Sequence, residues 1–181
     1  MKKFFLVISI LALMSLAIPL SLSAMEYQHK LEVKNMQFLW TIEGELIHIR
    51  LSAKTTGWVA VGFGPEKAMS GANIIIGAVK NGRVKIEDHY ANRKRGHASD
   101  EKLGGTNDVL NPSGTEEDGI TTVSFSFPLN SGDKYDKPVN PESTTRVMLA
   151  YGAGEDSFRN HHLYRTIYEI NLSTGENKKV K

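Results

Sequence analysis

Cysteine is absent from all 181 residues of the sequence. Without thiols the chain can form no disulfide, no zinc–thiolate site and no iron–sulfur cluster, and it lacks the C-x-x-C-H motif that attaches haem covalently. Any haem must therefore be held non-covalently. The stability of the chain must come from packing and, where one binds, from a ligand.

A strong excess of one charge is also absent. The chain has 22 Lys and Arg against 20 Asp and Glu, a net charge of +2, and Lys2 and Lys3 near the N-terminus account for that excess. A chain without a marked basic excess exerts little electrostatic attraction on phosphate backbones. We therefore expect no nucleic-acid partner.

Only one apolar run is long, and it lies at the N-terminus. Lys2 and Lys3 precede an apolar stretch over residues 4–20, and Ser21 and Ser23 are spaced as at a cleavage site. This pattern is typical of an export signal peptide over residues 1–24, whereas a retained segment would anchor the protein in a membrane. We expect an exported protein (periplasmic, extracellular or cell-surface) with one domain over residues 25–175 and a flexible tail over 176–181.

Short segments with the two-residue alternation of β-strands fill the rest of the sequence. Examples are "LIHIRLSA", "GWVAVGF", "RVKIEDHY" and "TTVSFSFPL", and "NIIIGAV" has the continuous apolar character of a strand buried on both faces. Asn81-Gly82 is a strong hairpin signal because both residues tolerate positive φ. The pattern predicts an all-β fold, an antiparallel β-sandwich with a closed barrel as the alternative.

A polar segment over residues 91–119 interrupts the strands, and we expect a long loop there. The carboxylates over residues 96–119 lack the spacing of an EF-hand, so we expect solvated loop charge there rather than a calcium site. Asp88-His89 and Asp100-Glu101 adjoin in sequence, but neighbours on a strand point to opposite faces. We therefore expect exposed polar groups at both pairs, not a catalytic dyad.

Motifs of nucleotide binding and hydrolysis are missing. In "GFGPEKAMSG" Lys67 stands where a dinucleotide fingerprint needs its third glycine, and Pro65 removes a backbone amide. Neither G-x-S-x-G nor H-E-x-x-H occurs. We expect no catalytic residues of these types.

Met69 and the pair His161-His162 are the residues that could bind a metal. A loop methionine commonly plugs a hydrophobic core, and a loop histidine commonly bonds to solvent. Thioether and imidazole together, however, hold haem iron in electron-transfer cytochromes, with no open coordination position. His48 and His89 alternate with charged residues, and we expect them to be solvated.

Two stretches of the sequence resemble the DOMON domain family. They are "GWVAVGFGPEKAMSGANIIIGAV" followed by "NGRVKIEDHYA", and the later "VMLAYGAGEDSFRNHHLYRTIYEINL". The resemblance covers most of residues 26–173 and implies an immunoglobulin-like antiparallel β-sandwich. One departure from the family pattern is Asn73, which stands where an aspartate is common.

Members that resemble the cytochrome domain of cellobiose dehydrogenase bind haem b between a loop methionine and a histidine near the C-terminus. The resemblance implies that Met69 is the first ligand and that His161 or His162 is the second. The spacing to Arg165 favours His161, which we rank first, while strand parity with Tyr164 favours His162. For such a haem site, Trp58 and Phe63 are candidates for the apolar walls or the core behind them, and Ala60 and Gly62 could leave room for the macrocycle. The cations that could neutralise a propionate are Arg159, Arg165 and Lys67.

The resemblance therefore implies a b-type cytochrome that is not an enzyme and passes single electrons to a transient redox partner, soluble or membrane-bound. We expect a monomer or weak oligomer. The alternative is a haem-free module that binds a carbohydrate or small ligand, for which Trp40, Tyr90 and Tyr151 are the available aromatic residues, although aromatics make up only 8% of the chain. A copper site that uses Met69 with histidines is a third hypothesis.

Overall fold

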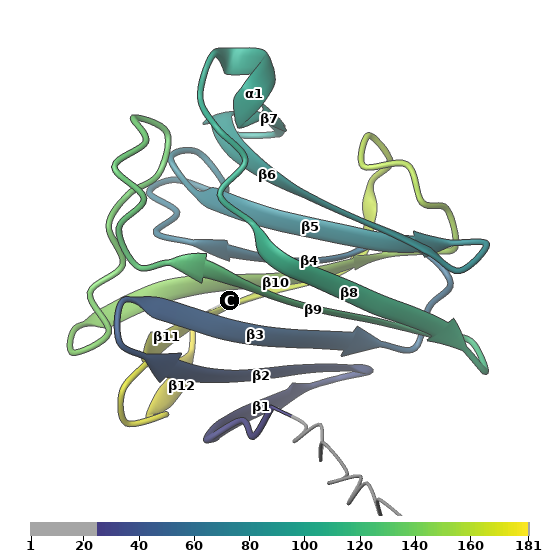
Figure 1. The fold of residues 1–181 in the computed structure, drawn as a ribbon, viewed down its shortest axis with the longest axis horizontal. Helices are drawn as coiled ribbons and strands as arrows, with labels where there is room; N and C mark the ends of the chain where they lie inside the picture. The colour runs from purple at the N-terminus through teal and green to yellow at the C-terminus, as the bar shows by residue number, and fades with distance from the viewer. Residues whose placement is uncertain (1–24, 181) are drawn as a thin grey trace, which may run out of the picture.

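Two antiparallel sheets face each other in the computed structural model, which describes residues 25–180 (Figure 1). The expected signal peptide, residues 1–24, lies outside the described residues. Among residues 25–180, no helix is long and apolar enough to cross a membrane.

Within residues 25–180 all neighbouring strands pair antiparallel, in the order β1-β2-β3-β9-β8 in the first sheet and β12-β11-β10-β4-β5-β6-β7 in the second. The five-stranded sheet consists of β1 (His29–Val33), β2 (Met36–Glu43), β3 (Leu46–Ala53), β8 (Leu110–Glu117) and β9 (Ile120–Pro128). The seven-stranded sheet consists of β4 (Val59–Phe63), β5 (Asn73–Lys80), β6 (Arg83–Arg93), β7 (Gly96–Ser99), β10 (Thr144–Gly152), β11 (His162–Asn171) and β12 (Asn177–Lys179). This arrangement confirms the predicted all-β, immunoglobulin-like sandwich.

The main core lies between the two sheets and follows from strand alternation. Val59, Val61 and Phe63 of β4 point into it, and the Phe63 ring lies 5.3 Å from that of Phe127 on β9. Trp40 is fully buried and donates its indole N–H to the carbonyl of Leu172 at 2.8 Å. Each large side chain buried in this way contributes about 1.5–3 kcal/mol relative to leaving it exposed.

The β5–β6 hairpin forms where the sequence predicts it. Asn81 and Gly82 connect the two strands with φ of 50° and 72°. Positive φ at both central residues is the geometry that matches the twist of the flanking strands. The continuously apolar β5 is buried from Asn73 to Val79, as expected for a strand covered on both faces.

One expectation about an irregular segment was wrong. The predicted loop over residues 91–119 contains β7, the short helix α1 (Asp100–Leu103) and β8. β8 is an exposed edge strand, so its polar side chains gave no alternating pattern. The predicted flexible tail includes β12, which pairs with β11 after a turn at Gly175 with φ of 77°.

Candidate functional site

A second apolar cluster covers the outer face of the seven-stranded sheet, opposite the main core. It forms because alternate side chains of β4, β5 and β10 point away from the five-stranded sheet. Its buried members are Trp58, Ala60, Ala72, Ile74, Ile76, Ala78 and Ala91, and Met69, Met148, Ala150 and Phe158 pack on them. An apolar outer face that is partly covered by other side chains can form a binding site for an apolar ligand.

Small residues form the floor of this face where β4 and β10 run side by side. Ala60 pairs with Ala150, and Gly62 pairs with Met148. The Met148 side chain covers Gly62, since its Cε lies 2.9 Å from the position a Cβ would take there. The floor is therefore flat, and the flexible Met148 side chain lies over one part of it.

Met69 reaches the outer face from the loop between β4 and β5. The amide of Gly71 donates to the carbonyl of Ala91 at 2.8 Å, and the amide of Ala91 donates to the carbonyl of Ala72 at 2.9 Å. These bonds fasten the loop to β6. Ala68 has a left-handed φ of 57°, and the half-buried thioether of Met69 packs on the apolar cluster.

His162 begins β11 at the other end of the same floor. It pairs with Gly152, next to a β-bulge between Tyr151 and Gly152. Partial desolvation, followed by the charge of Arg165, lowers the pKa of His162. A neutral imidazole is the form that binds a metal. His161 precedes the strand and lines a surface hollow with residues of the 153–160 loop.

An unpartnered donor lies at the His162 end of the floor. The indole N–H of buried Trp58 has no hydrogen-bond acceptor within residues 25–180. Its Nε1 lies 2.7 Å from the position a Cβ on Gly152 would take. A buried N–H without an acceptor is uncommon in proteins, and this one lies beside the residue that pairs with His162.

The other predicted site residues divide between the two faces. Ala60, Gly62 and Trp58 belong to the outer face, and Arg165 pairs with Ala150 and is exposed. Phe63 does not belong with them, because alternation on β4 places its ring in the core between the sheets. Trp40 and Tyr151 are likewise buried in that core, so they offer no surface to a carbohydrate.

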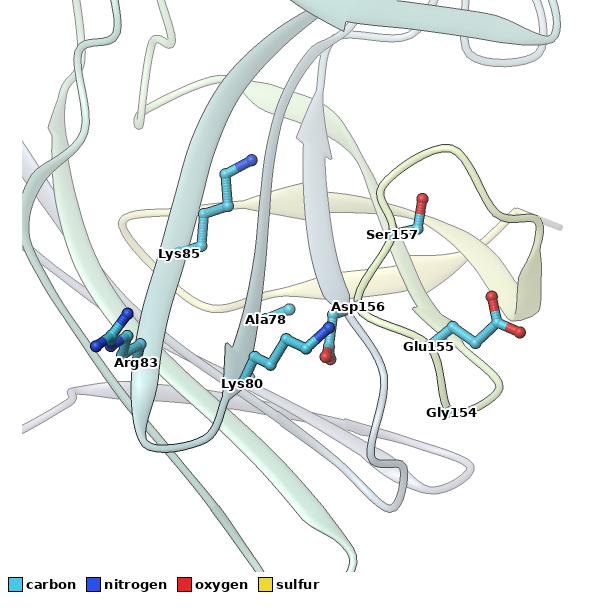
Figure 2. Close-up of a pocket in the computed structure, with 8 residues that line it drawn as sticks. All are labelled: Ala78, Lys80, Arg83, Lys85, Gly154, Glu155, Asp156 and Ser157. Atoms are coloured by element: carbon cyan, nitrogen blue, oxygen red, sulfur yellow. The ribbon is translucent and has the colours of Figure 1, made fainter.

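The loop over residues 153–161 covers part of the outer face through Phe158. The Phe158 ring meets His89 edge-on at 6.1 Å, and the Lys85 ammonium lies 5.2 Å from its centre. Beside it lies a shallow hollow that is basic on one side and acidic on the other. Figure 2 shows its lining residues, Ala78, Lys80, Arg83, Lys85, Gly154, Glu155, Asp156 and Ser157.

The expectation that His89 is solvated was wrong. His89 is only 5% exposed, and its Nδ1 lies 2.7 Å from Nδ1 of His97 while its Nε2 lies 2.9 Å from Glu87. Burial lowers the pKa of both histidines, that of His97 to about 4. Strand alternation correctly placed His89 on the outer face. It could not show that β7 and Phe158 bury the side chain there, because these residues are distant in sequence and their contacts leave no local pattern.

The expectation of exposed acidic groups was also wrong for Asp88 and Asp100, although Glu101 is exposed. Asp88 is 2% exposed and Asp100 is 1% exposed, and both lie near Asp108 and Asp136. Burial first, and then the neighbouring carboxylates, raise the pKa of Asp88 to about 8, that of Asp100 to about 7 and that of Asp136 to about 6. Asp88 belongs to the inner side of β6, opposite His89.

The structure is similar to the cytochrome b domain of pyranose dehydrogenase from Coprinopsis cinerea, with a TM-score of 0.58 and 13% identity, over 77% of this chain and 80% of that one. At this identity the likeness shows the fold. The DOMON domain model matches residues 32–152, and the chain belongs to this family.

Two relatives from animals match most of this chain. DBH-like monooxygenase protein 1 of Mus musculus is 31% identical over 144 residues, covering 78% of this chain and 23% of that protein. Putative DBH-like monooxygenase protein 2 of Homo sapiens is 30% identical over 155 residues, covering 77% of this chain and 29% of that protein. The chain thus spans about a quarter of the length of these relatives.

Proposed function

We propose that the chain is an exported b-type cytochrome domain that binds haem non-covalently on the outer face of the seven-stranded sheet and transfers single electrons. The observation that carries the proposal is the flat floor around Ala60 and Ala150, with Met69 at one end and His162 at the other. The fold likeness to a cytochrome b domain supports it.

The residues of this face fit a haem by their chemistry. Met69 offers a soft thioether, and His162 offers an imidazole whose lowered pKa keeps it neutral near pH 7. Small floor residues admit a flat ligand. The unpartnered indole N–H of Trp58 can donate to a polar group of that ligand, and the exposed Arg165 can pair with a propionate.

When bound, haem supplies a one-electron couple, which a methionine ligand shifts towards the reduced form. The chain's own residues do the rest. The apolar cluster excludes water from the floor, and Met69 and His162 fix the orientation of the group. Because Met69 and His162 would both hold the iron, we propose electron transfer for this chain rather than an oxygen-activating or hydrolytic reaction.

Between the two histidines, the proposal favours His162. It lies within β11 and pairs with Gly152 at the edge of the floor, whereas His161 lies in the loop and faces a surface hollow. This choice reverses the ranking that the spacing to Arg165 suggested. A soluble or membrane-bound redox partner would dock transiently beside this face through a small interface.

Haem titration followed by absorption spectroscopy tests the proposal. Wild type is expected to take up one haem per chain and to give a split, low-spin reduced spectrum. His162→Ala is expected to lose that spectrum while His161→Ala keeps it, which makes the two variants controls for each other. Wild type that takes up no haem at saturating concentration would refute the proposal.

A haem-free small-ligand module is the second candidate function. It is favoured by the fact that Phe158 and Met148 already cover part of the floor. Calorimetric binding of a saccharide or another small molecule by haem-free protein would support it. The burial of Trp40 and Tyr151 argues against a stacking surface for sugars.

A further inference from the structure

Three aspartates meet at one end of the sandwich, on the side of the sheet away from the apolar face. Asp88 comes from β6, Asp108 from the segment before β8, and Asp136 from the segment between β9 and β10. One carboxylate oxygen of each lies within 4.8 Å of the others. Asp100, at the start of α1, lies close enough to raise the pKa of Asp88 through its charge.

This cluster has no cation of its own. None of the salt bridges within residues 25–180 involves Asp88, Asp100, Asp108 or Asp136. Asp88 and Asp100 are buried, and Asp108 and Asp136 are half-buried. Buried carboxylates without a counter-charge are strongly unfavourable, and proteins normally pair them or use them to coordinate a metal. The cluster therefore needs positive charge from outside the chain, or bound protons.

Asn73 gives an independent indication of a ligand. It is neutral and 2% exposed, and its amide donates to Asp136 at 2.6 Å, so its head group lies against the cluster. Its side-chain oxygen has no donor within residues 25–180, and neither has one oxygen of Asp88. A buried amide oxygen and carboxylate oxygens without donors are the atoms that a hard cation would satisfy.

The two loops that supply Asp108 and Asp136 are tied together. Asp133 accepts from the backbone amide of Thr106 at 2.7 Å, and the Tyr135 hydroxyl donates to the carbonyl of Leu103 at 2.7 Å. The amide of Asp108 donates to Asp88 at 3.4 Å, which brings the first loop onto β6. These contacts hold the oxygen donors in place around one small volume.

We propose that Asp88, Asp108, Asp136 and the side-chain oxygen of Asn73 bind a calcium ion. All four donors are oxygens, which calcium prefers. The set contains no imidazole or thiolate, the ligands that zinc and copper prefer. Irregular loops supply two of the ligands, and calcium tolerates such geometry better than magnesium does. Asp100 adds negative charge beside the site. The site is independent of the proposed haem face.

Calcium-dependent stability of the full chain tests the proposal. After removal of divalent ions with EGTA, added calcium at about 100 times its Kd should raise the Tm by roughly 5–10 °C, and magnesium should raise it much less. Calorimetry should give one ion per chain. Terbium should show emission sensitised by Tyr135, and calcium should displace it.

Isosteric variants separate coordination from structure. Asp88→Asn and Asp108→Asn remove one negative charge each, so both should raise the Tm of the calcium-free protein and lower calcium affinity at least tenfold. The control Asp118→Asn, at an exposed turn with φ of 51°, should change neither. The proposal is overturned if calcium gives no heat and no Tm shift, or if the cluster variants bind calcium as wild type does.

Discussion

The seven-stranded sheet carries apolar, sulfur-containing and imidazole side chains on its outer face, whereas its inner face holds the main core and ends in buried carboxylates. The change occurs between neighbours: Asp88 points inward to the acidic cluster and His89 points outward to His97 and Phe158. One strand can thus serve two sites of opposite chemistry, because alternation separates them by the thickness of a sheet. The lesson is that adjacent polar residues on a strand can belong to different sites.

The largest effect should come from the core between the sheets. Phe63→Ala should destabilise the protein by about 3–5 kcal/mol, because it empties space against Phe127. Denaturant unfolding measures this change. The milder variant Phe63→Leu should keep full haem binding, since Phe63 lies on the face away from the proposed haem. A specific loss of haem binding in Phe63→Leu would contradict the separation of the core from the haem face.

The next effect is a pH dependence confined to the acidic end. Burial raises the pKa of Asp88 to about 8, above its unfolded value, so in EGTA its contribution to stability is complete below about pH 4 and disappears as the pH rises through 8. Asp100 and Asp136, with raised pKa values of about 7 and 6, should act in the same direction. The expected loss between pH 5 and pH 8.5 is roughly 2–4 kcal/mol.

Urea unfolding at a series of pH values measures that loss. Asp88→Asn should flatten the profile, while Asp118→Asn should leave it unchanged. If the free energy of unfolding of wild type in EGTA rises towards pH 8.5, the raised pKa values of these carboxylates would be contradicted.

Removing the cover of the outer face should have a smaller cost in stability and a visible effect on binding. Phe158→Ala is expected to destabilise the haem-free protein by only about 1 kcal/mol, because the ring lies in a surface loop. Haem uptake, followed by stopped-flow absorbance, should become faster, since Phe158 and Met148 lie over the floor. Slower or weaker uptake would show that Phe158 forms part of the haem pocket.

An effect of similar size on stability, with none on haem binding, should come from the histidine pair at the edge of the outer face. His89→Gln should cost about 1 kcal/mol through lost hydrogen bonds to Glu87 and His97. The haem spectrum should be unchanged, since we assign the imidazole ligand to β11. A lost low-spin spectrum in His89→Gln, with a retained one in His162→Ala, would move the ligand to β6.

The fold was predictable from the sequence because its signals are local. Alternation on β3, β4, β6 and β9, and the positive-φ turn at Asn81-Gly82, each act within a few residues. β8 and β12 were missed because their side chains are exposed, and pairing with a neighbour defines them. Strand parity also placed Phe63 on the opposite side from Ala60, although both were candidates for the haem site.

The acidic cluster could not be predicted in the same way. Its members lie between residues 73 and 136 and meet through loop closure. Asn73 was noted only as a departure from a family pattern, and no local signal connects it to Asp136. The Met69 loop and the 161–162 pair were predictable as candidates, but only the register of β10 and β11 relates them to a common floor.

The most direct test of the central proposal is the near-infrared charge-transfer absorption of the ferric, haem-loaded protein, which reports sulfur bound to iron. Wild type is expected to show this band together with a low-spin spectrum, and Met69→Ala should lose the band while remaining folded. A high-spin or bis-imidazole spectrum in wild type, or a band that persists in Met69→Ala, would contradict the assignment of Met69 as the ligand on the outer face.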